Sequence, residues 1–286
     1  MKTRVITAVV GLAVLAAVLA FFDTIVFDFV LSAICLLAIH EVFSAMGFGK
    51  KQWYLYAAAV PFTLLVMLTS SQSVRALILP FCFLLVLFLN VCQIAHVQTL
   101  DFGKLSGYVY FSGVIVFCFY SLIHLKRCLP FAQYRYDAIY FILLILCFAW
   151  GGDTAAYFAG RAFGKHKLAP KVSPKKTVEG AIGGLLGGVI GMTVFKLVAD
   201  SMAHTLTVYP PIEMAAGPQI SWGAVFALGI IGSTISQIGD MRFSVIKREF
   251  GVKDYGNLLP GHGGILDRFD SVTFVAPFVW LALQLL

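Results

Sequence analysis

Charged residues are scarce in this sequence, and their scarcity excludes a soluble globular protein. Only 12% of the 286 residues are Asp, Glu, Lys or Arg, whereas 60% are hydrophobic. Soluble domains usually carry about 25% charged residues. Several apolar runs exceed the roughly 18 residues that indicate a membrane-spanning helix. Because a helix satisfies its own backbone polar groups in lipid, we expect an all-α, polytopic integral membrane helical bundle.

Cysteine motifs are also absent. None of the six cysteines forms a C-x-x-C pair, and most of them fall inside apolar runs. The six are Cys35, Cys82, Cys92, Cys118, Cys128 and Cys147. This pattern favours small hydrophobic residues within the bundle over a disulfide or a thiolate metal site.

About nine apolar segments are long enough to form transmembrane helices. The first follows Lys2 and Arg4, as in a signal peptide, but it is long enough to span and further apolar segments follow. The predicted spans are residues 5–22, 24–45, 54–70, 76–95, 107–125, 136–158, 178–199, 221–243 and 265–286. The first five carry no recognisable chemistry.

Basic residues are distributed unevenly between the predicted loops. With a cytoplasmic N-terminus, 16 of the 21 Lys and Arg residues lie on the cytoplasmic side and only five lie on the outer side. Those five are Arg75, Lys126, Arg127, Arg135 and Lys196. Cytoplasmic loops of membrane proteins carry an excess of Lys and Arg, so this orientation is the favoured one.

Glycine is concentrated in the predicted span 178–199. Its six glycines form two rows with a spacing of four, 180/184/188 and 183/187/191. Each glycine costs roughly 1 kcal/mol in a helix interior, so the rows need a structural reason. Small residues at this spacing let two helices approach closely in lipid, and we predict that role here.

One polar cluster lies before residue 165, and a second polar cluster begins at that residue. The first ends the span 136–158, where Asp153, Tyr157, Gly160 and Gly164 share a helical face. A helix end that leaves the membrane at the headgroups would also have this composition.

The second cluster, residues 165–179, is basic. Ser173 can cap a helix whose first residue is Pro174. Lys175 and Lys176 would then lie on the first helical turn, where free N–H groups attract anions. A phosphate site and an ordinary loop on anionic headgroups both remain open.

The third cluster joins the end of the span 221–243 to residues 244–270. Ser233, Gln237, Asp240, Ser244 and Lys247 form a polar stripe with 4-3-4-3 spacing. A carboxylate within a spanning helix costs on the order of 2.5–3.5 kcal/mol, so Asp240 indicates function.

Further carboxylates follow the Gly-rich turn, residues 261–264. Asp267, Asp270 and Ser271 share one helical face just after this turn. Carboxylates from different helices, beside many cations, predict a divalent metal that bridges phosphate oxygens. Oxygen donors favour Mg²⁺, and the single His262 is better suited to hydrogen bonding than to ligation.

Residues 244–270 resemble the signature of phosphatidate cytidylyltransferases, also called CDP-diglyceride synthases. The matching pattern reads S-x-I-K-R at 244–248, K-D-x-G at 253–256 and L-P-x-H-G-G-I-x-D-R-F-D at 259–270. Segments 153–157, 173–180 and 236–240 also look like family segments. The resemblance is specific over about residues 150–271.

The resemblance implies an enzyme that transfers CMP from CTP to phosphatidate, forming CDP-diacylglycerol and pyrophosphate with one or two Mg²⁺ ions. By similarity, Asp240 and Asp267 bind the metal. The implied catalytic residues are Asp240, Asp267, Lys247, Arg248, Lys253, Asp254, Arg268 and Asp270. The implied substrate-binding residues are Asp153, Tyr157, Ser173, Lys175, Lys176, Thr177, Ser244, His262, Gly263 and Gly264.

The same resemblance divides the chain by role. Residues 1–135 would be scaffold and lipid-facing helices, and residues 136–286 would be the catalytic transmembrane region. We expect a multi-pass protein of the cell inner membrane with its active site facing the cytoplasm. Its expected partners are CTP, phosphatidate and the bilayer, with no nucleic acid, and a homodimer is left open.

Two other functions fit part of this pattern. A membrane lipid kinase using CTP or ATP would need similar metal and lysine chemistry. An ion-coupled transporter could use Asp153, Asp240 and Asp267 at discontinuous helices. The long basic loop and the shallow depth of the carboxylates argue against the transporter.

Overall fold

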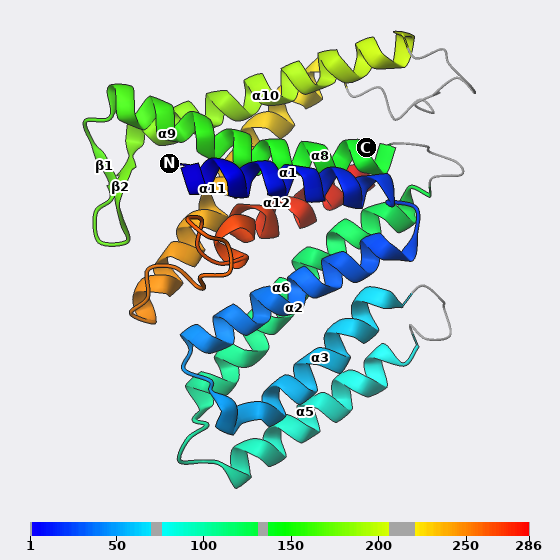
Figure 1. Ribbon diagram of the computed structural model, residues 1–286, viewed down its shortest axis with the longest axis vertical. Coiled ribbons are helices and arrows are strands. Elements are labelled where there is room, and N and C mark those ends of the chain that lie inside the picture. Colours follow the sequence, from blue (N-terminus) through cyan, green and yellow to red (C-terminus); the bar gives the residue numbers. More distant parts are fainter. Residues whose placement is uncertain (1, 70–75, 131–136, 206–220, 286) are drawn as a thin grey trace. The chain divides into compact units, whose positions relative to one another are not determined.

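The computed structural model describes residues 2–69, 76–130, 137–205 and 221–285, and most of them are helical. The predicted outer-loop residues Arg75 and Arg135 lie outside these ranges. Figure 1 labels the α-helices and the strands. In chain order the elements are α1 (Lys2–Ala20), α2 (Ile25–Ala45), the 3-10 helix η1 (Lys50–Gln52), α3 (Trp53–Leu68), α5 (Ile78–Ala95), α6 (Phe102–Cys128), α8 (Asp137–Leu146), the π-helix η2 (Cys147–Gly151), α9 (Gly152–Phe163), β1 (Lys167–Ala169), β2 (Ser173–Thr177), α10 (Val178–Thr205), α11 (Trp222–Glu249) and α12 (Leu266–Leu285).

Among the described residues, six segments are helical, long and apolar enough to cross a membrane. They are Ile25–Ala45, Ile78–Ala95, Phe102–Cys128, Asp137–Phe163, Val178–Val198 and Trp222–Glu249. The predicted helical membrane fold is confirmed, but the count of nine spans is not. The apolar part of α1, Ile6–Ala20, and the 16-residue α3 are shorter. Helix α12 opens with charged residues, which lower its apolar character.

The chain packs into two compact units. The first comprises Met1–Ile123 with Phe250–Arg268, and the second comprises His124–Glu249 with Phe269–Leu286. The first unit therefore contains both the N-terminal helices and most of the residues that resemble the family signature. The predicted division by role, at residue 135, is a different division and stays a prediction.

In the first unit, α3 packs on α2 and on α5, and α6 contacts α2 and α3 (Figure 1). Phe43 of α2 contacts both α3 and α6, because its ring meets Tyr56 edge to face at a centroid distance of 5.4 Å and stacks on Tyr108 at 4.8 Å. The buried Tyr108 hydroxyl donates to the Leu55 carbonyl oxygen at 3.0 Å, which satisfies its only polar group. These contacts join α2 and α3 to α6.

In the second unit, α10 packs closely on α9 and on α11. A Cβ at Gly183 or Gly187 would overlap the Cβ of Ala159 or Ala155 in α9, and one at Gly188 would overlap the Ser233 side chain in α11. Gly183, Gly187 and Gly188 therefore have the packing role that the sequence predicts, whereas a Cβ at Gly191 would meet nothing within 4 Å.

A short β-hairpin precedes α10 and extends beyond the ends of α9 and α10 (Figure 1). Its antiparallel strands pair Lys167 with Thr177 and Ala169 with Ser173. The predicted helix start at Ser173 and Pro174 is wrong, because strand pairing takes these residues. Helix α10 begins at Val178, and the Thr177 hydroxyl caps it by accepting from the Gly180 N–H at 3.1 Å.

Candidate functional site

The second unit brings the basic hairpin to the polar stripe of α11. Lys176 of β2 forms an ion pair with the Asp240 carboxylate. The Ser244 hydroxyl, one turn further along α11, donates to Asp240 Oδ1 at 3.4 Å. Two clusters that are separate in the sequence thus meet at one carboxylate.

Two more carboxylates of the second unit belong to this charged cluster. Asp270 of α12 is buried and interacts electrostatically with Asp240, Lys247 and Asp153. The Ser271 hydroxyl donates to Asp153 Oδ2 at 3.4 Å, which links α12 to α9. Three helices therefore each contribute one carboxylate, and Lys176 and Lys247 supply the opposite charge.

The hairpin is held to its neighbours through its backbone. Arg248 Nε donates to the Val172 carbonyl oxygen at 3.1 Å, which ties the hairpin to α11. The Glu179 carboxylate accepts from the Lys165 N–H at 3.1 Å and from the His166 ring Nδ1 at 2.6 Å. These contacts fix the backbone that carries Lys175 and Lys176.

In the first unit, Asp267 organises the loop before α12. Its Oδ2 accepts from the Tyr255 N–H and from the Gly264 N–H, both at 2.9 Å, and the residue is buried. The chain turns back through Gly261 and Gly263, whose φ angles of 78° and 86° favour glycine. A Cβ at Gly263 would lie 2.9 Å from Asp267 Oδ2. The predicted substrate-binding glycines therefore shape the backbone around Asp267.

The other predicted residues of the two units vary in exposure. In the first unit, Lys253, Asp254 and Arg268 are exposed and His262 is half-buried. The His262 N–H donates to the Leu259 carbonyl oxygen at 2.9 Å, closing the turn. In the second unit, Tyr157 is 61% exposed.

Sequence reasoning missed one residue, Glu41 of α2. Its Oε1 accepts from the Ile265 N–H at 2.8 Å, and its Oε2 accepts from the Leu266 N–H at 2.9 Å. We expected no recognisable chemistry in the first five helices, and this contact between α2 and the start of α12 was not predicted. The available signal was a carboxylate inside an otherwise apolar span, the same signal that identified Asp240.

The donor chemistry of the charged cluster fits a divalent cation. Asp153, Asp240 and Asp270 offer carboxylate oxygens, which hard cations prefer. Within the described ranges, however, no group of three or more His, Cys, Asp or Glu side chains is arranged to hold a metal ion. In this structure the Asp240 carboxylate forms an ion pair with Lys176. Asp240 and Asp267 belong to different units, so their meeting across a metal stays a prediction.

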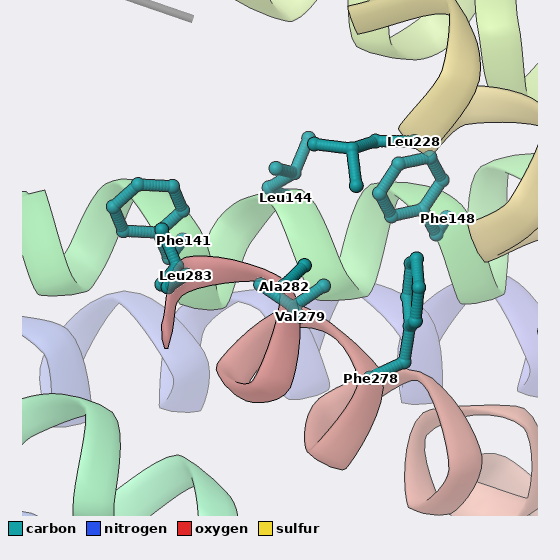
Figure 2. A pocket seen from close by; sticks show the side chains of 8 residues that line it. All are labelled: Phe141, Leu144, Phe148, Leu228, Phe278, Val279, Ala282 and Leu283. Atoms are coloured by element: carbon teal, nitrogen blue, oxygen red, sulfur yellow. The ribbon is translucent and has the colours of Figure 1, made fainter. Parts of the chain in front are cut away.

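Figure 2 shows an apolar pocket in the second unit. Its lining residues come from α8, η2, α11 and α12: Phe141, Leu144, Phe148, Leu228, Phe278, Val279, Ala282 and Leu283. None of them can bind a phosphate, so the pocket is separate in chemistry from the charged cluster.

Comparison with known proteins gives one family. A family model described as "Cytidylyltransferase family" matches residues 2–286. The phosphatidate cytidylyltransferase of Bacillus subtilis is 31% identical over 180 residues, 63% of this chain and 58% of the relative. That of Haemophilus influenzae is 34% identical over 143 residues, 50% of this chain and 45% of the relative.

A third relative shows the same extent of similarity. The phosphatidate cytidylyltransferase of Staphylococcus aureus is 34% identical over 151 residues, 52% of this chain and 51% of the relative. The chain thus spans about half the length of the curated relatives it matches.

Proposed function

Because the chain belongs to the cytidylyltransferase family, we propose that it transfers CMP from CTP to phosphatidate, forming CDP-diacylglycerol and pyrophosphate. The relatives described above carry the name of this activity. The observation that carries the proposal is the pairing of Lys176 with Asp240, beside Asp270 and Asp153. Such a cluster of carboxylates and cations suits a reaction between polyanions.

The reaction explains why cations are needed. A phosphate oxygen of phosphatidate attacks the α-phosphorus of CTP, and the bond from that phosphorus to the bridging oxygen of the β-phosphate breaks. Pyrophosphate then leaves with the bonding electrons. Both reactants are negatively charged, so the protein must offset their repulsion and the charge on the leaving group.

We propose that basic side chains supply part of this charge. We assign phosphate binding to Lys175, Lys176, Lys247, Arg248, Lys253 and Arg268. Lys176 is the best supported of these, because a carboxylate already holds its ammonium group. Arg248 is better supported as a residue that holds the hairpin in place, since its guanidinium donates to the Val172 carbonyl.

We propose Mg²⁺ as the divalent cation, held by the carboxylates of Asp240 and Asp267. When bound, such an ion neutralises phosphate oxygens and the charge that develops on pyrophosphate. Asp270 interacts electrostatically with both Asp240 and Asp153, so the cluster offers several carboxyl oxygens, which hard cations prefer as ligands. The backbone hydrogen bonds to Asp267 orient its carboxylate.

The protein is an integral membrane protein, and we propose the inner membrane as its location, with its N-terminus and site on the cytoplasmic side. Lipid would then reach the site laterally and CTP from the cytoplasm. The excess of Lys and Arg in the loops on that side supports this orientation.

The test is incorporation of labelled CTP into lipid by the purified chain in detergent. Asp267→Asn should lower the rate by about 100-fold or more, because it removes a charge that acts on the transition state. Its thermal unfolding should match the wild type, and Asp28→Asn, another buried carboxylate, serves as the control. Full activity of Asp267→Asn would refute the site assignment.

Product analysis separates the alternatives. Thin-layer chromatography distinguishes a nucleotidyl-lipid from the phospho-lipid that a lipid kinase would form. Turnover in detergent, with no ion gradient, excludes an ion-coupled transporter.

A further inference from the structure

The carboxylate of Glu41 lies at the start of α12, although Glu41 belongs to α2. We infer that Glu41 is a positioning residue, which fixes the Gly-rich turn and through it the orientation of Asp267. The hydrogen bonds of Glu41 are observed in the structure, and their meaning for catalysis rests on the proposed function.

Glu41 uses both of its carboxylate oxygens. Oε1 and Oε2 accept from consecutive amides, those of Ile265 and Leu266, at 2.8 and 2.9 Å. The first N–H groups of a helix have no partner within the helix, and a negative charge is favourable beside them. Because Glu41 is only 7% exposed, water cannot easily replace it.

Asp267 continues the same arrangement. Its Oδ2 accepts from the Gly264 N–H, which directly precedes the two amides that donate to Glu41. The same oxygen accepts from the Tyr255 N–H in the loop. Three successive amides, of residues 264–266, therefore donate to two carboxylates. Asp267 is held on one side by its own turn, and Glu41 holds the other end of that turn.

Two glycines of the signature make room for Glu41. A Cβ at Gly256 would lie 2.9 Å from Glu41 Cδ, and one at Gly264 would lie 2.6 Å from the same atom. Both glycines thus allow the buried carboxylate to reach the backbone. The signature segment is shaped around a residue that lies outside it, 224 positions before Ile265.

The positioning role of Glu41 bears on the prediction that residues 1–135 are only scaffold and lipid-facing helices. Helix α2 is more than scaffold, because it supplies the acceptor for the backbone that precedes Asp267. If Asp267 binds a cation, loss of Glu41 should weaken cation binding without removing any cation ligand. Residues that orient metal ligands typically change metal affinity by about 10–100-fold when replaced.

The test compares three full-chain variants in detergent. Glu41→Gln keeps the shape but leaves one good acceptor for two amides. Glu41→Asp keeps the charge but shortens the reach. Asp28→Asn is the matched control, because it is a buried carboxylate on α2, about 20 Å along the helix from Glu41.

Two readouts do not depend on turnover. Hydrogen–deuterium exchange should be faster in the peptide covering residues 259–268 of Glu41→Gln and unchanged elsewhere. Mn²⁺ binding, followed by electron paramagnetic resonance without nucleotide or lipid, should weaken by about 10-fold or more. Glu41→Asp should give intermediate values, and Asp28→Asn should match the wild type.

The catalytic readout is the requirement for Mg²⁺. In Glu41→Gln, the concentration for half-maximal CDP-lipid synthesis should rise by about 10-fold, with the KM for CTP at saturating Mg²⁺ nearly unchanged. A merely structural residue would lower the amount of active protein and leave the Mg²⁺ requirement as it was.

Several outcomes would overturn the inference. Unchanged exchange in residues 259–268 would show that Glu41 does not hold the turn. Faster exchange with unchanged Mn²⁺ affinity and Mg²⁺ requirement would reduce Glu41 to a structural contact, as would failure of both Glu41 variants to fold. Wild-type protein that binds no Mn²⁺ would remove the link to a cation. If the Glu41 variants weaken Mn²⁺ binding as expected but the wild type forms no CDP-lipid, only the proposed function fails.

Discussion

Lys176 and Asp240 form an ion pair although 64 residues separate them in the sequence. Their side chains are 30% and 20% exposed, so the pair lies where a ligand can reach it. Partly exposed ion pairs contribute little to stability, on the order of 1 kcal/mol or less. The pairing therefore serves the fold weakly and leaves Lys176 able to exchange its carboxylate partner for a phosphate.

Replacement of Lys176 by Ala should accordingly impair substrate binding more than stability. We expect the KM for CTP or for phosphatidate to rise by about 10-fold or more, because one phosphate contact is lost. The free energy of unfolding should change by about 1 kcal/mol or less. Steady-state kinetics with each substrate varied in turn provide the measurement.

Lys171→Ala is the control for that prediction. Lys171 lies in the turn of the same hairpin and is exposed, so its loss removes the same charge from the loop. Equal effects of the two variants would indicate a general effect of loop charge, and no change in either KM would remove Lys176 from the site.

Loss of Arg248 should loosen the hairpin. The hydrogen bond from Arg248 Nε to the Val172 carbonyl oxygen is one of its ties to α11. In Arg248→Ala, trypsin should cleave at residues 171–176 about fivefold faster, the factor that corresponds to about 1 kcal/mol of lost hydrogen bonding. Glu249→Gln, an exposed neighbour, should cleave at the wild-type rate. Equal cleavage rates in all three proteins would contradict the anchoring role.

The glycines of α10 should differ in their tolerance of alanine. A Cβ at Gly183 or Gly187 would overlap a Cβ of α9, whereas one at Gly191 would meet nothing within 4 Å. Gly183→Ala and Gly187→Ala should each destabilise the protein by about 1–3 kcal/mol. Gly191→Ala should be neutral or stabilise by up to about 1 kcal/mol, because alanine favours the helix. Thermal unfolding in detergent measures all three, and a destabilised Gly191→Ala would contradict this account.

Local sequence patterns predicted much of the fold and the polar stripe of α11. The apolar runs indicated membrane helices, and the glycine rows of α10 indicated close packing, because each depends on neighbours along one helix. The stripe through Asp240 and Ser244 was visible for the same reason, since helical spacing alone places these residues on one face.

Such local patterns could not predict contacts between segments that are far apart in the sequence. Ser173 and Pro174 match a helix start locally, but pairing of residues 173–177 with 167–169 outweighs that preference. Glu41 could not be matched with Ile265 and Leu266, because no periodicity connects residues so far apart. Its presence in an apolar span was a signal of function, but only the folded chain identifies its partner.

Alanine at Gly264 offers a direct test of that partnership. The new Cβ would lie 2.6 Å from Glu41 Cδ, so Gly264→Ala should destabilise the protein by about 1–3 kcal/mol through overpacking. Gly113→Ala is a suitable control in the same unit, since a Cβ there meets nothing within 4 Å. Gly264→Ala should also lower CDP-lipid synthesis, because the displaced carboxylate no longer holds the start of α12.

A second substitution should relieve the first. Glu41→Asp is one methylene shorter and withdraws the carboxylate from the new Cβ, so the double variant should be more stable than the sum of the two single effects. Residues in contact show such coupling, with values of about 0.5–3 kcal/mol. The measurement is a double-mutant cycle, which compares the unfolding free energies of the wild type, both single variants and the double variant. Strict additivity would mean that the two positions do not contact each other, and the role proposed for Glu41 would lose its structural basis.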